Sequence, residues 1–177
     1  RAVNMPEGRS AMAASFESLF RQSNGKPVEY KGKTLYIADR FPVTSGERLR
    51  ITFESWDSPW KQGIGLASID KNPLSINGNR RKCYIALMQG NVPRVFEFTI
   101  GTKGAEIFVY NVWEEDGALR SGNYGSAMIV EEIPNGRRYR CNDWEPDEDF
   151  NDLIFTIEHI PQPDAVEDKD VKRCDKQ

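Results

Sequence analysis

The chain has 177 residues, 24 of them Lys or Arg and 27 Asp or Glu, which gives a formal net charge of -3. This length fits one globular domain, and charges of mixed sign give no strong field that would attract nucleic acid or acidic lipid. No run approaches the roughly 18 apolar residues of a membrane-spanning helix, and no charged-then-apolar leader opens the chain. We therefore expect a single unit that has no nucleic-acid partner and does not insert into a membrane.

The first predicted element is an amphipathic helix over residues 10–23. Ser10 is a suitable N-cap, and Asn24-Gly25 is a typical stop signal. Apolar residues recur at helical spacing between them: Met12, Phe16, Leu19 and Phe20. We assign this helix to an N-terminal extension that covers residues 1–26.

Short runs of β-branched and aromatic residues, bounded by Gly, Pro, Asn or Asp, dominate the rest of the chain. The clearest strand is 48–54, where Leu49, Ile51 and Phe53 share one face. The other candidate strands are 34–38, 64–69, 82–88, 95–100, 106–111, 127–132 and 152–158. Turn signals lie at 77–78, 101–104, 116–117 and 135–136. We expect a mainly β fold, an antiparallel two-sheet β-sandwich of jelly-roll or lectin-like type over residues 27–160, with one N-terminal helix.

The cysteines and the single histidine give little indication of chemistry. Cys83, Cys141 and Cys174 lack the paired short spacings of zinc or redox motifs, although a disulfide between Cys83 and Cys141 remains open. His159 follows a predicted strand with no nucleophile or second ligand nearby in sequence, so we expect a structural role for it. Residues 161–177 combine two prolines with alternating charges and are interpreted as a charged tail or linker.

An acidic run near the C-terminus carries the clearest functional signal. Asp147, Asp149 and Asn151 alternate, Asp152 follows at once, and six acidic side chains lie between Asp143 and Asp152. Calcium takes six to eight oxygen ligands, whereas magnesium needs a stricter octahedron and zinc or copper favours His and Cys. Most charge runs are solvated loops, but here the run leads directly into an apolar strand, which favours an anchored loop. We therefore predict that it binds calcium.

The string from Asp147 to Ile154 resembles the Asp-x-Asp-aromatic-Asn-Asp-apolar motif of two calcium-dependent groups. One is the bacterial lectins that bind fucose and mannose through two calcium ions, and the other is a set of β-sandwich domains in large bacterial surface adhesins. The resemblance covers about a dozen residues. It implies a ligand set of Asp143, Asp147, Asp149, Asn151 and Asp152, whereas we expect Glu145 and Glu148 to face solvent.

Two departures from these families limit what the resemblance implies. The two-calcium lectins complete their sugar site with a C-terminal glycine carboxylate, whereas this chain continues past Ile160. A second likeness, to galactose-binding bacterial lectins, runs through residues 84–126, but Val112 stands where those lectins have an Asp ligand. Both likenesses point to a calcium-bound or sugar-facing β-sandwich, and calcium binding does not by itself imply sugar binding.

Aromatic residues in predicted loops are the candidates for contact with a ligand. Large aromatics at strand ends usually cap the core of a sandwich, and this is our interpretation of most of them. Trp144 lies between Asp143 and Glu145, beside any ligand that the metal would hold, and Tyr124 lies in a glycine-containing loop. We predict Trp144 and Tyr124 as ligand-binding residues. The basic run 137–140 lies immediately before the acidic run and is expected to neutralise those acids or to pair with them across the sheet.

Three functional hypotheses follow. The leading one is a non-enzymatic, secreted or cell-surface module that binds calcium and recognises glycans or supports adhesion. Millimolar calcium outside the cell would saturate even a weak site. The second is a calcium-regulated enzyme or self-processing domain that uses the same carboxylates, and the third is a structural or protein-interaction module of a larger adhesin, stabilised by calcium. The expected cofactor is calcium, and the expected partners are glycans or a cell-surface molecule.

Overall fold

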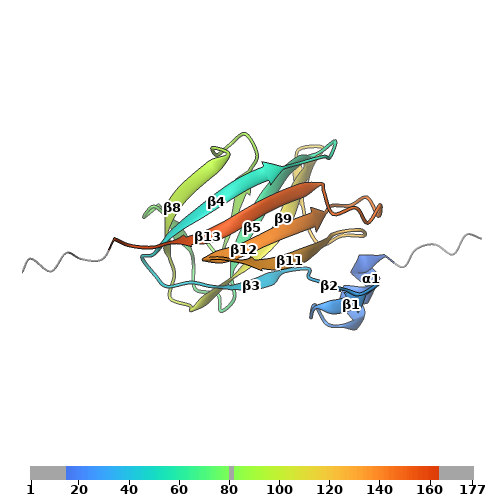
Figure 1. Ribbon diagram of the computed structural model, residues 1–177, viewed down its shortest axis with the longest axis horizontal. Coiled ribbons are helices and arrows are strands. Elements are labelled where there is room, and N and C mark those ends of the chain that lie inside the picture. Colours follow the sequence, from blue (N-terminus) through green and yellow to red (C-terminus); the bar gives the residue numbers. More distant parts are fainter. Residues whose placement is uncertain (1–14, 80–81, 164–177) are drawn as a thin grey trace, which may run out of the picture.

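The fold is mainly β, with antiparallel sheets of six and five strands, a separate hairpin and one short helix (Figure 1). The computed structural model describes residues 15–79 and 82–163. The prediction of a mainly antiparallel fold with one N-terminal helix is confirmed. No helix within these described ranges is long and apolar enough to cross a membrane.

The six-stranded sheet has the order β11-β12-β13-β4-β8-β6. Its strands are β4 (Arg48–Ser55), β6 (Ser75–Ile76), β8 (Val95–Gly101), β11 (Ala127–Ile133), β12 (Gly136–Asn142) and β13 (Leu153–Ile160). The five-stranded sheet has the order β10-β9-β5-β7, and β3 also pairs with β9. Its strands are β3 (Asp39–Pro42), β5 (Lys61–Ser68), β7 (Tyr84–Met88), β9 (Glu106–Glu115) and β10 (Ala118–Arg120).

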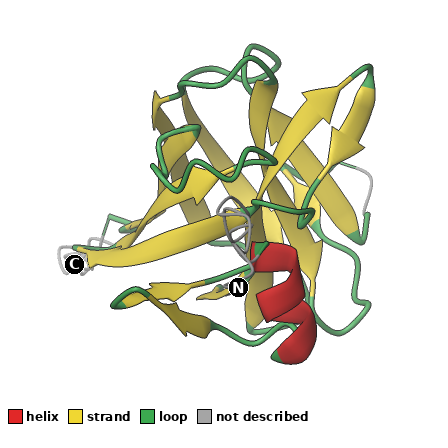
Figure 2. Cartoon of the chain, turned by 90° about the vertical axis from the view of Figure 1, so that its right-hand side faces the viewer, coloured by secondary structure: helices red, strands yellow, loops and turns green. Residues whose placement is uncertain are grey.

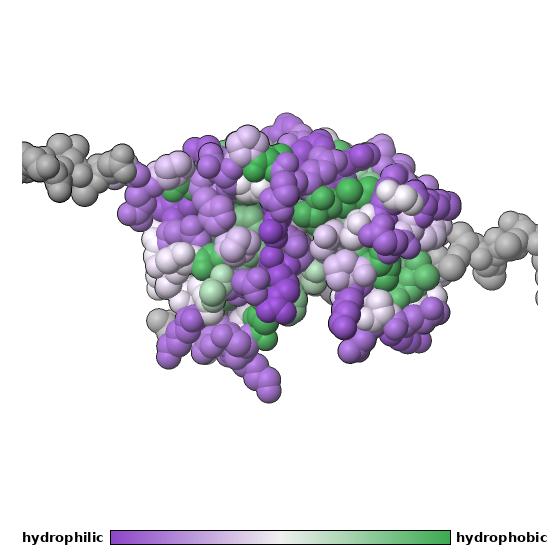
Figure 3. All heavy atoms as spheres, turned by 60° about the horizontal axis from the view of Figure 1, so that its bottom comes forward, coloured by the Kyte–Doolittle hydropathy of each residue, from purple (hydrophilic) through white to green (hydrophobic). Residues whose placement is uncertain are grey.

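One apolar core lies between the two sheets. The alternation of β4 buries Leu49, Ile51 and Phe53, and Ile51 lies opposite Ile157 of the neighbouring strand β13. These side chains share one buried cluster with residues of the five-stranded sheet, among them Leu66. Burial of two facing sheet surfaces in a single core makes the fold sandwich-like. The face seen in Figure 3 is mostly hydrophilic, with separate hydrophobic patches.

A second, smaller cluster joins the N-terminal elements to one end of the sandwich. Helix α1 (Phe16–Gln22) and the hairpin of β1 (Val28–Tyr30) and β2 (Lys33–Leu35) surround it. Its buried members are Phe16, Phe20, Leu35, Ala127 and Phe150. We call α1, β1 and β2 together the N-terminal module. The residue that the acidic run contributes to this cluster is Phe150, so the module packs directly against that run.

The helix differs at its start from the sequence prediction. It begins at Phe16 with Ser15 as N-cap, rather than after Ser10, because the extended backbone of Ser15 lets its side chain accept from the amide of Ser18. Residues 10–14 of the predicted helix lie outside the described residues. The stop signal is confirmed: Asn24 and Gly25 have positive φ, and the Gly25 amide donates to the carbonyl of Phe20.

Several strands were not predicted from the sequence, and β12 is the most important of them. Its three arginines read as a basic run, yet Tyr139 and Cys141 alternate into the core between them. Arg137 and Arg138 form ion pairs with acids outside the acidic run: Arg137 contacts Glu132 and Asp39, and Arg138 contacts Glu131 and Glu54. The expected strand 34–38 is shorter, since β2 ends at Leu35. Strands β1, β3, β6 and β10 were also not expected.

The possible disulfide between Cys83 and Cys141 does not form. Cys83 is exposed next to β7, in the five-stranded sheet, whereas Cys141 is fully buried in β12 of the six-stranded sheet, and both thiols are free. Burial raises the pKa of the Cys141 thiol, which therefore behaves as a small apolar core residue. Cys174 and most of the predicted tail lie outside the described residues.

Candidate metal centre

The acidic run forms the loop that joins β12 to β13 at the end of the sandwich that carries α1 (Figure 2). Its ends are brought together by the ladder, because Cys141 pairs with Leu153. The amide of Asp143 donates to Oδ2 of Asp152 at 2.7 Å, and the amide of Phe150 donates to Oδ1 of Asn142 at 2.8 Å. The loop is therefore closed by specific hydrogen bonds near both of its ends.

Alternate residues of the loop adopt an unusual backbone conformation. Glu148 and Phe150 have φ of 60° and 55°, a left-handed region that costs a non-glycine residue about 1–2 kcal/mol. The Asp147 carboxylate accepts from the amide of Asp149 at 3.4 Å, and the Asp149 carboxylate accepts from the amide of Asn151 at 3.1 Å. Each of these two Asp side chains therefore accepts from the backbone amide two residues further along and tightens a turn of the loop.

Three carboxylates converge as a result. Ligand oxygens of Asp147, Asp149 and Asp152 all lie within 4.8 Å of one another. Two calcium ligands on opposite sides of one ion are separated by about 4.6–5.2 Å, twice the usual calcium–oxygen distance. The side-chain oxygen of Asn151 is buried and accepts no hydrogen bond from the described residues. The donor set consists of hard oxygens and could hold a cation such as calcium.

The electrostatics of the cluster are unfavourable without a cation. Asp152 is 4% exposed, and burial raises the pKa of its carboxyl to about 7, with further contributions from the charges of Asp143, Asp147 and Asp149. The hydrogen bond from the Asp143 amide acts in the opposite direction. A bound cation would remove this repulsion and favour the ionised form of Asp152.

Asp143 is not one of the three converging carboxylates, although its backbone contacts Asp152. It is fully buried, and its side chain accepts hydrogen bonds from the Ser58 hydroxyl at 2.6 Å, the Gln62 amide at 3.0 Å and the backbone amide of Glu145 at 3.1 Å. Its backbone amide orients Asp152, so in this structure Asp143 positions a member of the cluster. Its role as a direct ligand stays a prediction.

The N-terminal module supports the loop from outside. Phe150 is 2% exposed and stacks on Phe16 with a centroid separation of 6.0 Å. Glu148 accepts from the Tyr30 hydroxyl at 2.6 Å and from Lys31 at 2.7 Å, and both contacts lower the pKa of its carboxyl. Glu148 was expected to face solvent like Glu145, so that part of the expectation was wrong. No local sequence signal identified Tyr30 or Lys31 as partners of the acidic loop.

Aromatic rings gather beside the loop at the same end of the sandwich. Trp144 is 41% exposed, and its ring packs edge-on against Trp60 and lies 5.2 Å from the ring of Tyr124. A Cβ on Gly125 would lie 2.7 Å from the carbonyl oxygen of Trp144, so only glycine allows this approach. The two predicted ligand-binding residues, Trp144 and Tyr124, are therefore in contact. Trp113, by contrast, is fully buried in the core.

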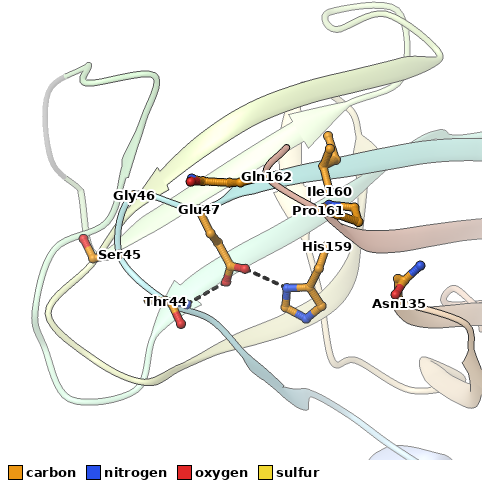
Figure 4. Close-up of a pocket in the computed structure, with 9 residues that line it drawn as sticks. All are labelled: Thr44, Ser45, Gly46, Glu47, Asn135, His159, Ile160, Pro161 and Gln162. Atoms are coloured by element: carbon orange, nitrogen blue, oxygen red, sulfur yellow. Dashed lines mark hydrogen bonds and ion pairs between the residues drawn. The ribbon is translucent and has the colours of Figure 1, made fainter. Parts of the chain in front are cut away.

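His159 lies at the opposite end of the molecule, in a pocket of about 530 Å³ (Figure 4). Its Nδ1 is 2.8 Å from a carboxylate oxygen of Glu47, whose other oxygen accepts from the amide of Thr44 at 2.6 Å. The imidazole stacks on Phe41 at 4.9 Å. These contacts tie the end of β13 to the turn before β4, in keeping with the structural role expected for His159.

Comparisons with known proteins give no family for this chain. No family model matches it, and neither the curated proteins nor the solved structures contain a match. The established description is therefore a mainly β, sandwich-like fold with an acidic cluster that could hold a metal ion.

Proposed function

We propose that this chain is a calcium-binding β-sandwich module that recognises glycans at the end bearing the acidic loop. The observation that carries the proposal is the convergence of Asp147, Asp149 and Asp152 on the same loop as the exposed Trp144. An oxygen-only donor set on a short loop suits calcium better than magnesium or a transition metal. The motif resemblance to calcium-dependent bacterial lectins and adhesin domains supports the same ion.

Glycan recognition is supported by the aromatic rings at the same end of the sandwich as the cluster. A sugar ring presents an apolar face that stacks on an aromatic ring, and its hydroxyls are suitable calcium ligands. Trp144 supplies an exposed ring, and Tyr124 packs against it. In this proposal the ion holds hydroxyls of the sugar while Trp144 covers its face. The partner is then a glycan, free or on a cell surface, and the module is secreted or surface-exposed, where calcium is abundant.

A structural role for the ion is the second candidate, and Phe150 is the observation that favours it. Phe150 belongs to the cluster that joins the N-terminal module to the sandwich, and its immediate neighbour Asp149 is a member of the triad. An ion that fixes the loop would therefore also fix this junction, as expected for a calcium-stabilised module of a larger adhesin.

Thermal melting tests the ion. The chelator-stripped protein should melt at a higher temperature after calcium is added, and less so with equal magnesium. Saturation at 100 times the dissociation constant stabilises the fold by about 2.7 kcal/mol. Asp149→Ala should abolish the calcium shift, whereas the matched change Asp164→Ala in the tail should retain it. A wild-type melting temperature that calcium leaves unchanged would contradict the proposal.

A glycan array with calcium and with chelator separates the two candidates. Calcium-dependent glycan binding that Trp144→Ala removes, while the calcium melting shift remains, supports recognition. A calcium shift without binding to any glycan on the array supports the structural role and refutes recognition.

A further inference from the structure

A small pocket lies next to the acidic loop and belongs to neither the metal cluster nor the Trp144 rings. It has a volume of about 320 Å³ and lies between the end of β4 and the loop that joins β7 to β8. Its lining residues are Phe53, Trp56, Gln89, Gly90, Val92 and Arg94. The amide of Asp57, the neighbour of Trp56, donates to the carbonyl of Asp152 at 3.3 Å. The pocket therefore adjoins the candidate metal centre through one backbone contact.

The walls of this pocket offer apolar surface and hydrogen-bond donors. Phe53 and Val92 supply apolar surface, and Trp56 is 40% exposed. Arg94 is held in place, since Nε donates to the carbonyl of Phe53 at 2.8 Å, Nη2 donates to the carbonyl of Glu54, and the guanidinium lies 5.6 Å from the Trp56 ring centre. Its Nη1 donates to no acceptor among the described residues, so a preorganised donor is available to a ligand.

The second polar side chain of the pocket also presents a donor. The amide oxygen of Gln89 already accepts from the backbone amide of Gln62 at 3.1 Å, while Nε2 of Gln89 has no acceptor within the described part of the chain. No carboxylate of the described residues lines the pocket. A ligand group that fits these donors must bring acceptor oxygens, and a carboxylate brings the most.

The charges around the pocket favour an anion on one side. Arg94 lines it, and Lys61 contacts Asn91 of the same β7–β8 loop at 2.7 Å. Asp57 follows the lining residue Trp56 in sequence and is hydrogen-bonded through its backbone to Asp152, and the negative charges of this region repel an anion in the absence of a cation. Three carboxylates and one divalent cation leave a smaller negative charge than the carboxylates alone, so occupation of the metal centre would weaken this repulsion. This predicts a stronger calcium dependence for anionic ligands than for neutral ones.

We propose that the pocket binds a carboxylate-bearing sugar residue of an acidic glycan. The ring packs against Trp56 and Val92, and the carboxylate accepts from Arg94 and Gln89. Tryptophan and arginine in one small pocket are the residue types that dominate binding energy at recognition sites. This inference rests on the proposed glycan recognition and narrows it to acidic glycans, with Arg94 as the residue that determines specificity.

Titration calorimetry with two defined probes tests the proposal. The probes are hyaluronan oligosaccharides, which carry glucuronate, and neutral chito-oligosaccharides of equal length, each with saturating calcium and with chelator. We expect the acidic probe to bind more tightly, and Arg94→Gln to weaken it at least about tenfold while leaving the neutral probe unchanged. Arg94→Lys should recover part of the lost affinity, because lysine retains the positive charge but lacks the paired donors of the guanidinium. Arg40→Gln at the far end is the matched control.

Each outcome bears on one claim. Equal affinity for the acidic and neutral probes, or unchanged acidic binding by an Arg94→Gln variant with wild-type melting temperature, overturns the assignment of the pocket while the calcium shift stands. If Arg94→Gln melts lower, Trp56→Ala, which leaves the Arg94 charge in place, must weaken the acidic probe; unchanged binding there also overturns it. Arg94-dependent binding of the acidic probe to a protein that calcium does not stabilise would support the pocket and refute the proposed metal function.

Discussion

Asp152→Asn should stabilise the calcium-free protein, by an amount that grows as the pH rises from about 4 to about 7. Burial and the neighbouring charges raise the pKa of the Asp152 carboxyl from 3.8 to about 7 in the folded chain. The folded state therefore binds an extra proton between these two values. The resulting stability is fully present below about pH 4 and is lost as the pH rises through about 7.

The size of the effect follows from the same two values. Their difference corresponds to about 4 kcal/mol, at 1.36 kcal/mol per pKa unit. Water screens the contributions of the exposed Asp147 and Asp149, so we expect about 2–4 kcal/mol at pH 8. At pH 5 we expect roughly a third of that effect, because the unfolded carboxyl is already ionised there. The side-chain oxygen of the introduced asparagine can still accept the hydrogen bond from the amide of Asp143. The substitution therefore removes the charge and retains the hydrogen bond that closes the loop.

Urea unfolding of both proteins with chelator, at pH 5 and pH 8, measures this difference. The stability advantage of the variant over the wild type should be larger at pH 8 than at pH 5. Added calcium should raise the free energy of unfolding of the wild type but not that of the variant. The Asn72 contacts lower the pKa of Asp70, so Asp70→Asn is a control that should show no such gain at pH 8. If Asp152→Asn and the wild type lose the same stability between pH 5 and pH 8, Asp152 is not the destabilising group and the electrostatic reasoning fails.

Three other substitutions test the packing around the site and the core. Phe150→Ala should lower the free energy of unfolding by about 3–4 kcal/mol and weaken calcium binding, measured by urea unfolding and calorimetry, because Phe150 anchors the loop. Gly136→Ala should destabilise by more than about 2 kcal/mol in the same unfolding assay, since its Cβ would lie 2.0 Å from the carbonyl oxygen of Ile157; wild-type stability would contradict this close approach. Tyr139→Phe should destabilise by about 1.5–3 kcal/mol, because the Tyr139 hydroxyl donates to the buried carboxylate of Asp39 at 2.7 Å; an unchanged unfolding midpoint would show that this bond adds nothing.

Local patterns in the sequence determined much of the fold. Alternation in 48–54 predicted both a strand and its buried face, because side chains of a strand point to opposite sides in turn. Asn77-Gly78 and Asp116-Gly117 predicted turns, and the structure places positive φ at all four residues. The acidic run likewise identified Asp147, Asp149 and Asp152 as a group, since residues so close in sequence can converge within one loop.

Tertiary structure alone decided what surrounds those residues. Glu148 meets Tyr30 across 118 positions of sequence, and Asp143 meets Gln62 across 81. Pocket residues Trp56 and Arg94 likewise come from different segments. Strand β12 was missed because its arginines concealed the alternation of Tyr139 and Cys141. Local periodicity records which side of an element is buried, whereas the partner that buries it depends on strand order and loop closure over long distances. The sequence therefore determined the acidic cluster, and the fold decided which of its members are hydrogen-bonded, buried or exposed.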